Sequence, residues 1–286
     1  MKKGIVVLLL LSQLVSASDL TPIAPEPSGI IGQYVTGKQG AVRAASGGKT
    51  AIGTTTKIFP QIVVGDGWET TLVIVNLSDK RVNFLEQFFD NTGAPMKVAF
   101  RTIPEGKLTE TSGAVAYLDP HESFNIRLFD AGTPLQQGWS WLVYDETQGR
   151  LGAYATFRQR VTGRPDFEAL VPLSPYDDWK FYMPFDNLND FSTAIALVNT
   201  AANLSAQISL TFYDVNGVRL LSDMVTLPQS GSGAFAIPDR YPALKGKVGT
   251  VYVQSNVNRL SALGLRFNPQ GAFSTIPIMN WDGMFR

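Results

Sequence analysis

The sequence predicts an all-β protein that contains two tandem antiparallel β-sandwiches of immunoglobulin-like shape. Apolar and polar residues alternate over short stretches such as 207–212 and 262–267, which is the pattern of strands that bury one face. Turn sequences such as Asp-Asn-Thr-Gly at 90–93 separate these stretches. No long stretch keeps the spacing of an amphipathic helix without Gly or Pro.

The second observation is an internal repeat, because residues 58–173 and 181–278 carry the same series of motifs in the same order. Residues 72–76 match 195–199, and Gly138 matches Gly246. Each copy has the length of a sandwich with about seven short strands. The first copy has extra polar, turn-forming residues at about 99–116, which predict a long loop or an additional hairpin.

The N-terminal part of the chain predicts export. Residues 1–17 combine Lys2 and Lys3 with an apolar run and a final Val-Ser-Ala, which is the pattern of a signal peptide. The apolar run is too short to span a bilayer, which takes about 20 residues. Residues 18–57 are rich in Pro, Gly and Ala and predict a flexible lead. We therefore expect a secreted, periplasmic or cell-surface protein, with no membrane span after cleavage.

Composition excludes several classes of protein. The chain has 286 residues, of which 44% are hydrophobic, with 24 basic and 24 acidic residues, no Cys and one His. This balance is too apolar for a disordered chain, and it lacks the basic excess of a nucleic-acid-binding protein. Thiol chemistry, Cys-based zinc sites and iron–sulfur clusters are excluded. No cofactor motif is present, so we expect no cofactor.

Catalytic motifs are weak, and we assign no catalytic residue. His121 is the only imidazole and lies in a predicted turn, and no serine-hydrolase motif surrounds Ser230 or Ser232. Carboxylate pairs leave open a small carbohydrate-active hydrolase, which needs two acidic groups across one bond. These pairs are Asp145 with Glu146, Asp177 with Asp178, and Asp186 with Asp190.

The sequence predicts a metal site no more strongly than it predicts a catalytic site. Residues 185–190 offer several side-chain oxygens, but the loop lacks the glycine and the acidic residue that an EF-hand places at fixed positions. Oxygen-rich loops can bind calcium without a fixed motif, so an inter-domain calcium site stays open. We assign no metal-binding residue.

Trp139 and Trp141 are the candidate ligand-contact residues. They lie two apart in a predicted strand, so both side chains point to the same side. The matched positions in the second copy are Lys247 and Gly249, so the shared core does not require aromatic groups there. Two interpretations remain open: packing under the extra loop or against the neighbouring domain, or an aromatic face for sugar or protein.

Three motifs resemble a tandem domain of secreted soil-bacterial proteins, an uncharacterised family of β-sandwich modules. They are the run at 67–76, Phe88-Phe89-Asp90, and the run at 151–158. The resemblance covers about 58–278, and it implies the fold and export without implying any activity.

These observations favour an exported, non-catalytic binding or structural module. We expect its partner to be an extracellular or cell-surface protein or polysaccharide, and we expect no nucleic acid. The alternative is the hydrolase with an Asp/Glu pair.

Overall fold

The computed structural model describes residues 54–280, except 104–105, 107, 130–133 and 176–177. Strand makes up 64% of the described residues and helix 3%, so the prediction of an all-β protein is confirmed. The predicted signal peptide at 1–17 and residues 18–53 of the predicted lead lie outside the described residues. The first strand begins at Thr54, so residues 54–57 belong to a strand rather than to the lead.

The first sheet pair consists of two antiparallel sheets. Sheet A has the strand order β11-β1-β8-β3-β6, and sheet B has the order β10-β9-β2-β7-β4-β5. The strands are β1 (Thr54–Val64), β2 (Trp68–Asn76), β3 (Val82–Asp90), β4 (Val98–Ile103), β5 (Thr109–Thr111), β6 (Gly113–Leu118), β7 (Ser123–Leu128), β8 (Gln136–Asp145), β9 (Leu151–Gln159), β10 (Phe167–Pro172) and β11 (Ser174–Pro175).

The second sheet pair also consists of two antiparallel sheets. Sheet C has the order β16-β13-β18-β19, and sheet D has the order β15-β14-β17-β12-β20. The elements are β12 (Lys180–Asp186), β13 (Ser192–Asn199), β14 (Ala206–Asp214), β15 (Arg219–Leu227), β16 (Ser232–Ala236), helix α1 (Ile237–Arg240), the 3-10 turn η2 (Pro242–Leu244), β17 (Val248–Ser255), β18 (Leu260–Phe267), β19 (Phe273–Ile276) and β20 (Met279–Asn280).

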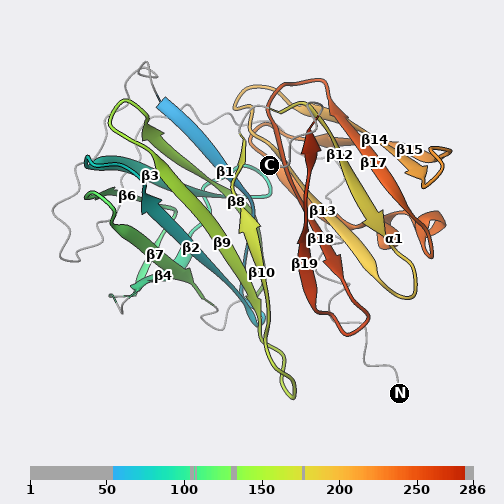
Figure 1. Cartoon of the computed structure of the whole chain (residues 1–286), viewed down its shortest axis with the longest axis horizontal. Helices are drawn as coiled ribbons and strands as arrows, with labels where there is room; N and C mark the ends of the chain where they lie inside the picture. Colours follow the sequence, from blue (N-terminus) through green and yellow to red (C-terminus); the bar gives the residue numbers. More distant parts are fainter. Residues whose placement is uncertain (1–53, 104–105, 107, 130–133, 176–177, 281–286) are drawn as a thin grey trace.

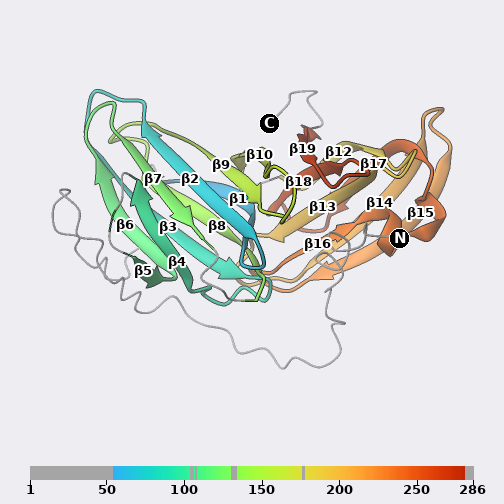
Figure 2. The ribbon, with the colours of Figure 1, turned by 90° about the horizontal axis from the view of Figure 1, so that it is seen from below.

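Each sheet pair buries apolar side chains between its two sheets. Phe88 of sheet A and Phe157 of sheet B belong to one cluster, and Phe212 of sheet D and Ile195 of sheet C belong to another. Burial of one such side chain contributes about 1.5–3 kcal/mol. The two sheet pairs lie side by side, with the edge strands β10 and β19 next to each other (Figures 1 and 2).

The two sheet pairs have the same strand order. Sheet A corresponds to sheet D strand by strand, with β1, β8, β3 and β6 in the places of β12, β17, β14 and β15. Strands β10-β9-β2-β7 of sheet B correspond in the same way to β19-β18-β13-β16 of sheet C. Strands β4 and β5 extend sheet B beyond β7, within the region where the first copy has extra residues.

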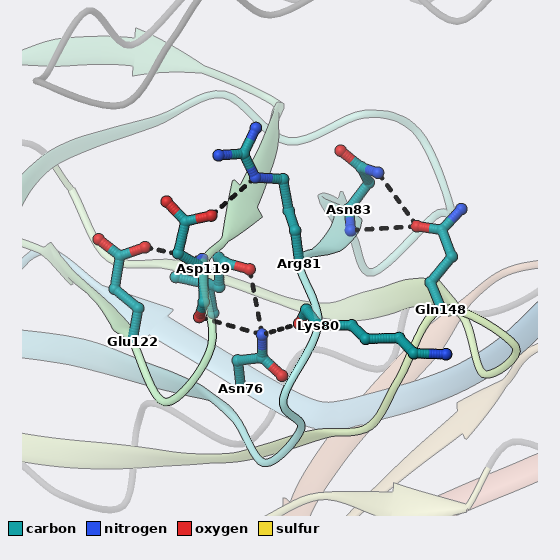
Figure 3. A network of polar contacts seen from close by, with 8 residues as sticks. Asn76, Lys80, Arg81, Asn83, Asp119, Glu122 and Gln148 are labelled. Carbon is teal, nitrogen blue, oxygen red and sulfur yellow. Dashed lines mark hydrogen bonds and ion pairs between the residues drawn. The ribbon is translucent and has the colours of Figure 1, made fainter.

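A buried asparagine at the end of a central strand fixes the same turn in both pairs. The Asn76 Nδ2 donates to the carbonyl oxygens of Lys80, Leu118 and Asp119 at 2.7, 3.1 and 3.0 Å, as Figure 3 shows. Asn199 repeats this arrangement, because its Nδ2 donates to two carbonyls at 2.7 and 2.8 Å. The two asparagines therefore occupy equivalent positions, as their matching in the sequence predicted.

The strand register corrects one part of the sequence matching. Gly138 lies opposite Asp90 in the first pair, and Gly249 lies opposite Asp214 in the second. A Cβ on either glycine would lie 1.9 Å from a carbonyl oxygen of the neighbouring strand. Gly138 is therefore equivalent to Gly249, and the matching to Gly246 was wrong by three residues.

Candidate functional site

The corrected register gives Trp139 and Trp141 new counterparts. Because Gly138 is equivalent to Gly249, Trp139 corresponds to Thr250 and Trp141 to Tyr252. The earlier matching to Lys247 and Gly249 was wrong. An aromatic side chain is thus present at the Trp141 position in both sheet pairs, whereas the Trp139 position is aromatic in the first pair alone.

Trp139 lies between the two sheet pairs and is fully buried. Its side chain is on the outer face of sheet A, away from the core between sheets A and B. We call the residues gathered here the junction cluster: Ile58, Phe89, Trp139 and Trp141 of sheet A, with Val198 of sheet C. The ring of Phe89 stacks on Trp139 with centroids 4.5 Å apart and planes 19° apart.

Hydrogen bonds connect this cluster to the second sheet pair. The Trp139 Nε1 donates to the carbonyl oxygen of Ser230 at 2.9 Å. The Ser232 hydroxyl donates to the Asn91 Oδ1 at 3.0 Å, and the Ser232 amide donates to the Asn91 carbonyl at 3.0 Å. A buried indole N–H without an acceptor would cost free energy, so the Ser230 carbonyl fixes where Trp139 can pack.

The opposing surface is the outer face of sheet C. It presents the small residues Ala194, Ala196 and Ala234, which pack into the same apolar cluster as the first sheet pair. These alanines line one apolar space together with Trp68 and Phe157 of sheet B. The sheet that faces the junction is therefore apolar on both sides, since its inner face closes the core of the second pair.

A small cavity lies at the same junction and has a volume of about 50 Å³. Its walls include Val63, Trp68 and Phe157 of the first sheet pair and Ala196, Leu263 and Phe267 of the second. An apolar cavity that holds benzene measures about 150 Å³. A sugar ring therefore does not fit into this space.

The outer face of sheet D is the counterpart of the covered face of sheet A. Tyr182, Tyr213 and Tyr252 occupy the places of Ile58, Phe89 and Trp141. Together with Thr250 and Gln254 we call them the tyrosine face. All three tyrosines are partly exposed, and on the same face Met224 is 59% exposed. The positions of Ile58, Phe89 and Trp139, which are buried in the first pair, are therefore partly exposed in the second. Trp141 and its counterpart Tyr252 are both partly exposed.

The tyrosines form one contiguous group. The rings of Tyr182 and Tyr252 lie 4.7 Å apart at 34°, and the Tyr252 hydroxyl donates to the Gln254 Oε1 at 3.2 Å. Burial raises the pKa of the Tyr252 phenol, and the nearby Tyr182 and Tyr213 raise it further. The Tyr252 phenol is therefore neutral at physiological pH, and the three tyrosines present ring faces and hydroxyl groups together.

Two of the carboxylates that were candidates for hydrolysis, Asp145 and Asp186, serve in a turn and in an ion pair. The Asp145 carboxylate accepts hydrogen bonds from the hydroxyl and amide of Thr147, which hold its pKa below the usual range. Partial burial opposes ionisation of Asp186, but Arg266 at 2.6 Å and the Leu188 amide lower its pKa overall. Asp177 lies outside the described residues.

His121 and the oxygen-rich loop at 185–190 show no assembled site among the described residues. The His121 Nε2 lies 3.2 Å from an oxygen of Asp79, and both side chains are largely exposed. In the loop at 185–190, the Asn187 side chain is bound to the Thr193 amide and the Leu244 carbonyl. Within the described part of the chain, no group of three or more His, Asp or Glu side chains could hold a metal ion.

Sequence analysis missed a buried acid in the core of the first sheet pair. Glu86 is fully buried between Phe84 and Phe88 on the inner face of sheet A. Burial raises its pKa well above the usual range, although the Ser140 hydroxyl opposes this. Among the described residues, neither carboxyl oxygen has a hydrogen bond of standard geometry. The equivalent residue in the second pair is Leu210.

Comparisons with protein-family models, with curated proteins and with solved structures found no match. Within the described residues, no helix has the length and apolar composition to span a membrane.

Proposed function

We propose that this chain is an exported, non-catalytic binding or structural module. In this proposal, residues 1–17 direct export, and the two sheet pairs are tandem immunoglobulin-like sandwiches that arose by duplication. The tyrosine face contacts an extracellular or cell-surface protein or polysaccharide. The equal strand order of the two pairs supports the duplication.

One observation carries the binding proposal: the same face is covered in one sheet pair and open in the other. In sheet A this face holds the buried Trp139, and in sheet D it holds partly exposed tyrosines. Tyrosine supplies a large contact area at a low cost in conformational entropy, and its hydroxyl forms hydrogen bonds at interfaces. Exposed aromatic groups of this kind mark contact surfaces.

The hydrolase with an Asp/Glu pair has less support. A retaining or inverting glycosidase needs one carboxylic acid of raised pKa beside a second carboxylate in a cleft. The pKa values of Asp145 and Asp186 are lowered. Glu86 has a raised pKa but lies in the sheet core, where no substrate reaches it.

Binding of the purified chain to a cell-envelope fraction, and to xylan, dextran and alginate in solution, tests this proposal. A Tyr182→Ala, Tyr252→Ala double variant should bind at least about tenfold more weakly, because central aromatic contacts dominate interface energies. Tyr117→Ala, on sheet A outside the junction cluster, is the matched control and should bind normally.

Trp141 stays a predicted ligand contact, and Trp141→Ala tests it in the same assay. If the chain binds none of these materials, or if the double variant binds as well as the unmodified chain, the tyrosine face is not the contact surface.

A further inference from the structure

The outer face of sheet B has a different character from its counterpart on sheet C. The strand order makes the two faces equivalent, and the register matches their positions one by one. On sheet C, three of these positions hold the buried Ala194, Ala234 and Ala236. On sheet B, the same positions hold Thr71, Asn125 and Arg127. The copy of this face that lies in the junction is therefore apolar, whereas the other copy carries polar groups and a positive charge.

A second arginine comes from the part of sheet B that the second sheet pair lacks. Strand β4 extends the sheet beyond β7 and has no counterpart in sheet C. Arg101 of β4 lies directly opposite Arg127 of β7, and both residues are exposed. Opposed residues on neighbouring strands have Cβ atoms about 4.5–5.5 Å apart, and like charges at such positions destabilise the sheet. A local conflict of this kind is expected where a residue serves binding rather than folding.

The two arginines also lack a counter-charge. In the described part of the chain, neither Arg101 nor Arg127 forms an ion pair. The Arg101 guanidinium carbon lies 5.4 Å from the centroid of the Phe129 ring. Glu110 of β5 lies diagonal to Arg101, opposite Ala99, and it forms no ion pair with either arginine. Two exposed positive charges therefore stand side by side on this face.

The other charged groups of the same face are paired with one another. Glu69 lies 2.8 Å from Arg160 and 3.7 Å from Arg158. Glu168 lies 3.8 Å from Arg158, which also binds Asp166. These acids are thus held at the β9–β10 side of the sheet, away from β4 and β7. An incoming anion finds its free positive charge at Arg101 and Arg127.

Hydroxyl groups continue the row that the arginines begin. The register places Arg101, Arg127, Thr71 and Thr156 opposite one another on the successive strands β4, β7, β2 and β9. Neighbouring strands are about 4.8 Å apart, so the row is about 14 Å long. Tyr154, which is 39% exposed, lies two residues from Thr156 on the same side of β9. We call these five residues the arginine row.

We propose that the arginine row binds an acidic polysaccharide, with uronate carboxylates on Arg101 and Arg127 and sugar hydroxyls on the two threonines. The planar guanidinium group binds a carboxylate through two parallel hydrogen bonds, and Tyr154 offers a ring and a hydroxyl group to a sugar. A nucleic acid needs a basic excess, whereas the whole chain has 24 basic and 24 acidic residues. This site goes beyond the proposed function, because it lies on the other sheet pair and selects for charge.

Isothermal titration calorimetry of the whole chain with polygalacturonate tests the site. Highly methyl-esterified polygalacturonate has the same backbone without the negative charges, and it should bind at least about tenfold more weakly, because it loses the charge-assisted hydrogen bonds. The affinity for polygalacturonate should fall as NaCl rises from about 50 to about 500 mM, because salt screens exposed charges. Equal binding of the ester, or no binding of polygalacturonate at the lower salt concentration, would overturn the proposal.

Replacement of the two arginines tests their role. An Arg101→Gln, Arg127→Gln double variant should bind polygalacturonate at least about tenfold more weakly, because arginines are frequent centres of binding energy. Its unfolding temperature should equal or exceed that of the unmodified chain, since a like-charge pair is removed. Arg219→Gln, at an exposed arginine of β15, is the matched control and should bind normally. Unchanged binding by the double variant would contradict the assignment.

Other polyanions test whether the ligand is a saccharide. Polyglutamate, duplex DNA and vesicles that contain phosphatidylglycerol all carry negative charge without uronate hydroxyls. Each should bind at least about tenfold more weakly than polygalacturonate, because a site that bonds hydroxyl groups rejects ligands without them. Equal binding of any of the three would show that the arginine row does not select an acidic polysaccharide.

The outcomes also separate this inference from the proposed function. Alginate carries carboxylates, so neutral xylan and dextran are the polymers that report on the tyrosine face alone. A chain that binds no polygalacturonate, while Tyr182→Ala, Tyr252→Ala abolishes envelope binding, contradicts the arginine row and leaves the tyrosine face standing. A chain that binds polygalacturonate through Arg101 and Arg127, while the tyrosine variant binds the envelope normally, supports the arginine row and contradicts the tyrosine face.

Discussion

The outer faces of sheets A and D occupy the same place in two sheet pairs of equal strand order, yet they have opposite environments. In sheet A, Trp139 is fully buried and bonded to Ser230 of the other pair. In sheet D, Thr250 stands at that position, beside partly exposed tyrosines. One scaffold can thus bury this face against a neighbouring sheet in one pair and leave it partly exposed in the other.

We expect the largest difference in stability between the two sheet pairs when Trp139 is replaced. Trp139→Ala should lower the free energy of unfolding by about 3–5 kcal/mol, the usual cost of deleting a buried aromatic side chain. Thr250→Ala at the equivalent position should change it by less than about 1 kcal/mol. Urea unfolding followed by far-UV circular dichroism measures both, and equal effects would mean that Trp139 is not the centre of the junction.

Glu86 provides a second contrast, because the second pair has Leu210 in its place. Its folded-state pKa is raised, so the folded chain holds the proton that the unfolded chain loses above its own lower pKa. The contribution of Glu86 to stability should therefore be highest below about pH 4.3. It should fall by about 1.4 kcal/mol per pH unit as the pH rises towards the folded-state pKa.

Glu86→Leu should remove this pH dependence and raise stability at pH 8 by about 1–3 kcal/mol. Leu210→Glu should introduce the same pH dependence into the second pair. Urea unfolding between pH 4 and pH 9 gives the answer, and an unchanged pH profile in Glu86→Leu would contradict a buried neutral acid.

Substitution of two turn glycines separates the effect of the contact across the junction from the effect of backbone strain. Gly93 and Gly217 have φ values of 88° and 77°, so alanine at either position should cost about 1–2 kcal/mol in backbone strain. A Cβ at Gly93 would also lie 2.8 Å from the carbonyl oxygens of Gln229 and Ser230, whereas nothing lies within 4 Å of one at Gly217.

Gly93→Ala should therefore cost at least about 1 kcal/mol more than Gly217→Ala, since overpacking typically costs 1–3 kcal/mol. Thermal unfolding of the two variants side by side measures this difference. Identical unfolding temperatures would show that the turn at 90–93 does not contact the second sheet pair closely.

Replacement of the two asparagines should show the smallest difference in stability between the two sheet pairs. Asn76 and Asn199 each bind backbone carbonyls at the end of a central strand. Asn76→Ala and Asn199→Ala should each lower stability by about 1–3 kcal/mol, because buried carbonyl groups lose their donor. Hydrogen exchange of the adjacent turns should reveal a local loss of protection in each variant. A large effect in one variant alone would contradict the equivalence of the two turns.

Alternation of apolar residues was sufficient to predict the strands, because a pleated strand with one buried face leaves that pattern directly in the sequence. It was also sufficient to find Glu86, which alternates with Phe84 and Phe88 on the buried side, although this signal was overlooked. The match of Asn76 to Asn199 succeeded because both residues follow the same apolar strand.

The burial of Trp139 by the second sheet pair could not be predicted in the same way. The strand register of Trp139 depends on hydrogen bonds between β3 and β8. In the second pair, the elements α1 and η2 change the length of the connection before β17, the strand equivalent to β8. A match of motifs by their order therefore slipped by three residues. Which outer face is covered depends on how two folded units dock, and local alternation carries no information about that.

Hydroxyl-radical footprinting with mass spectrometry tests the central contrast most directly. In dilute solution, Tyr182 and Tyr252 should be oxidised several times faster than Trp139, after correction for the intrinsic reactivity of each side chain. If Trp139 is oxidised as fast as Tyr252, then the face of sheet A is not covered, and the difference between the two sheet pairs does not exist.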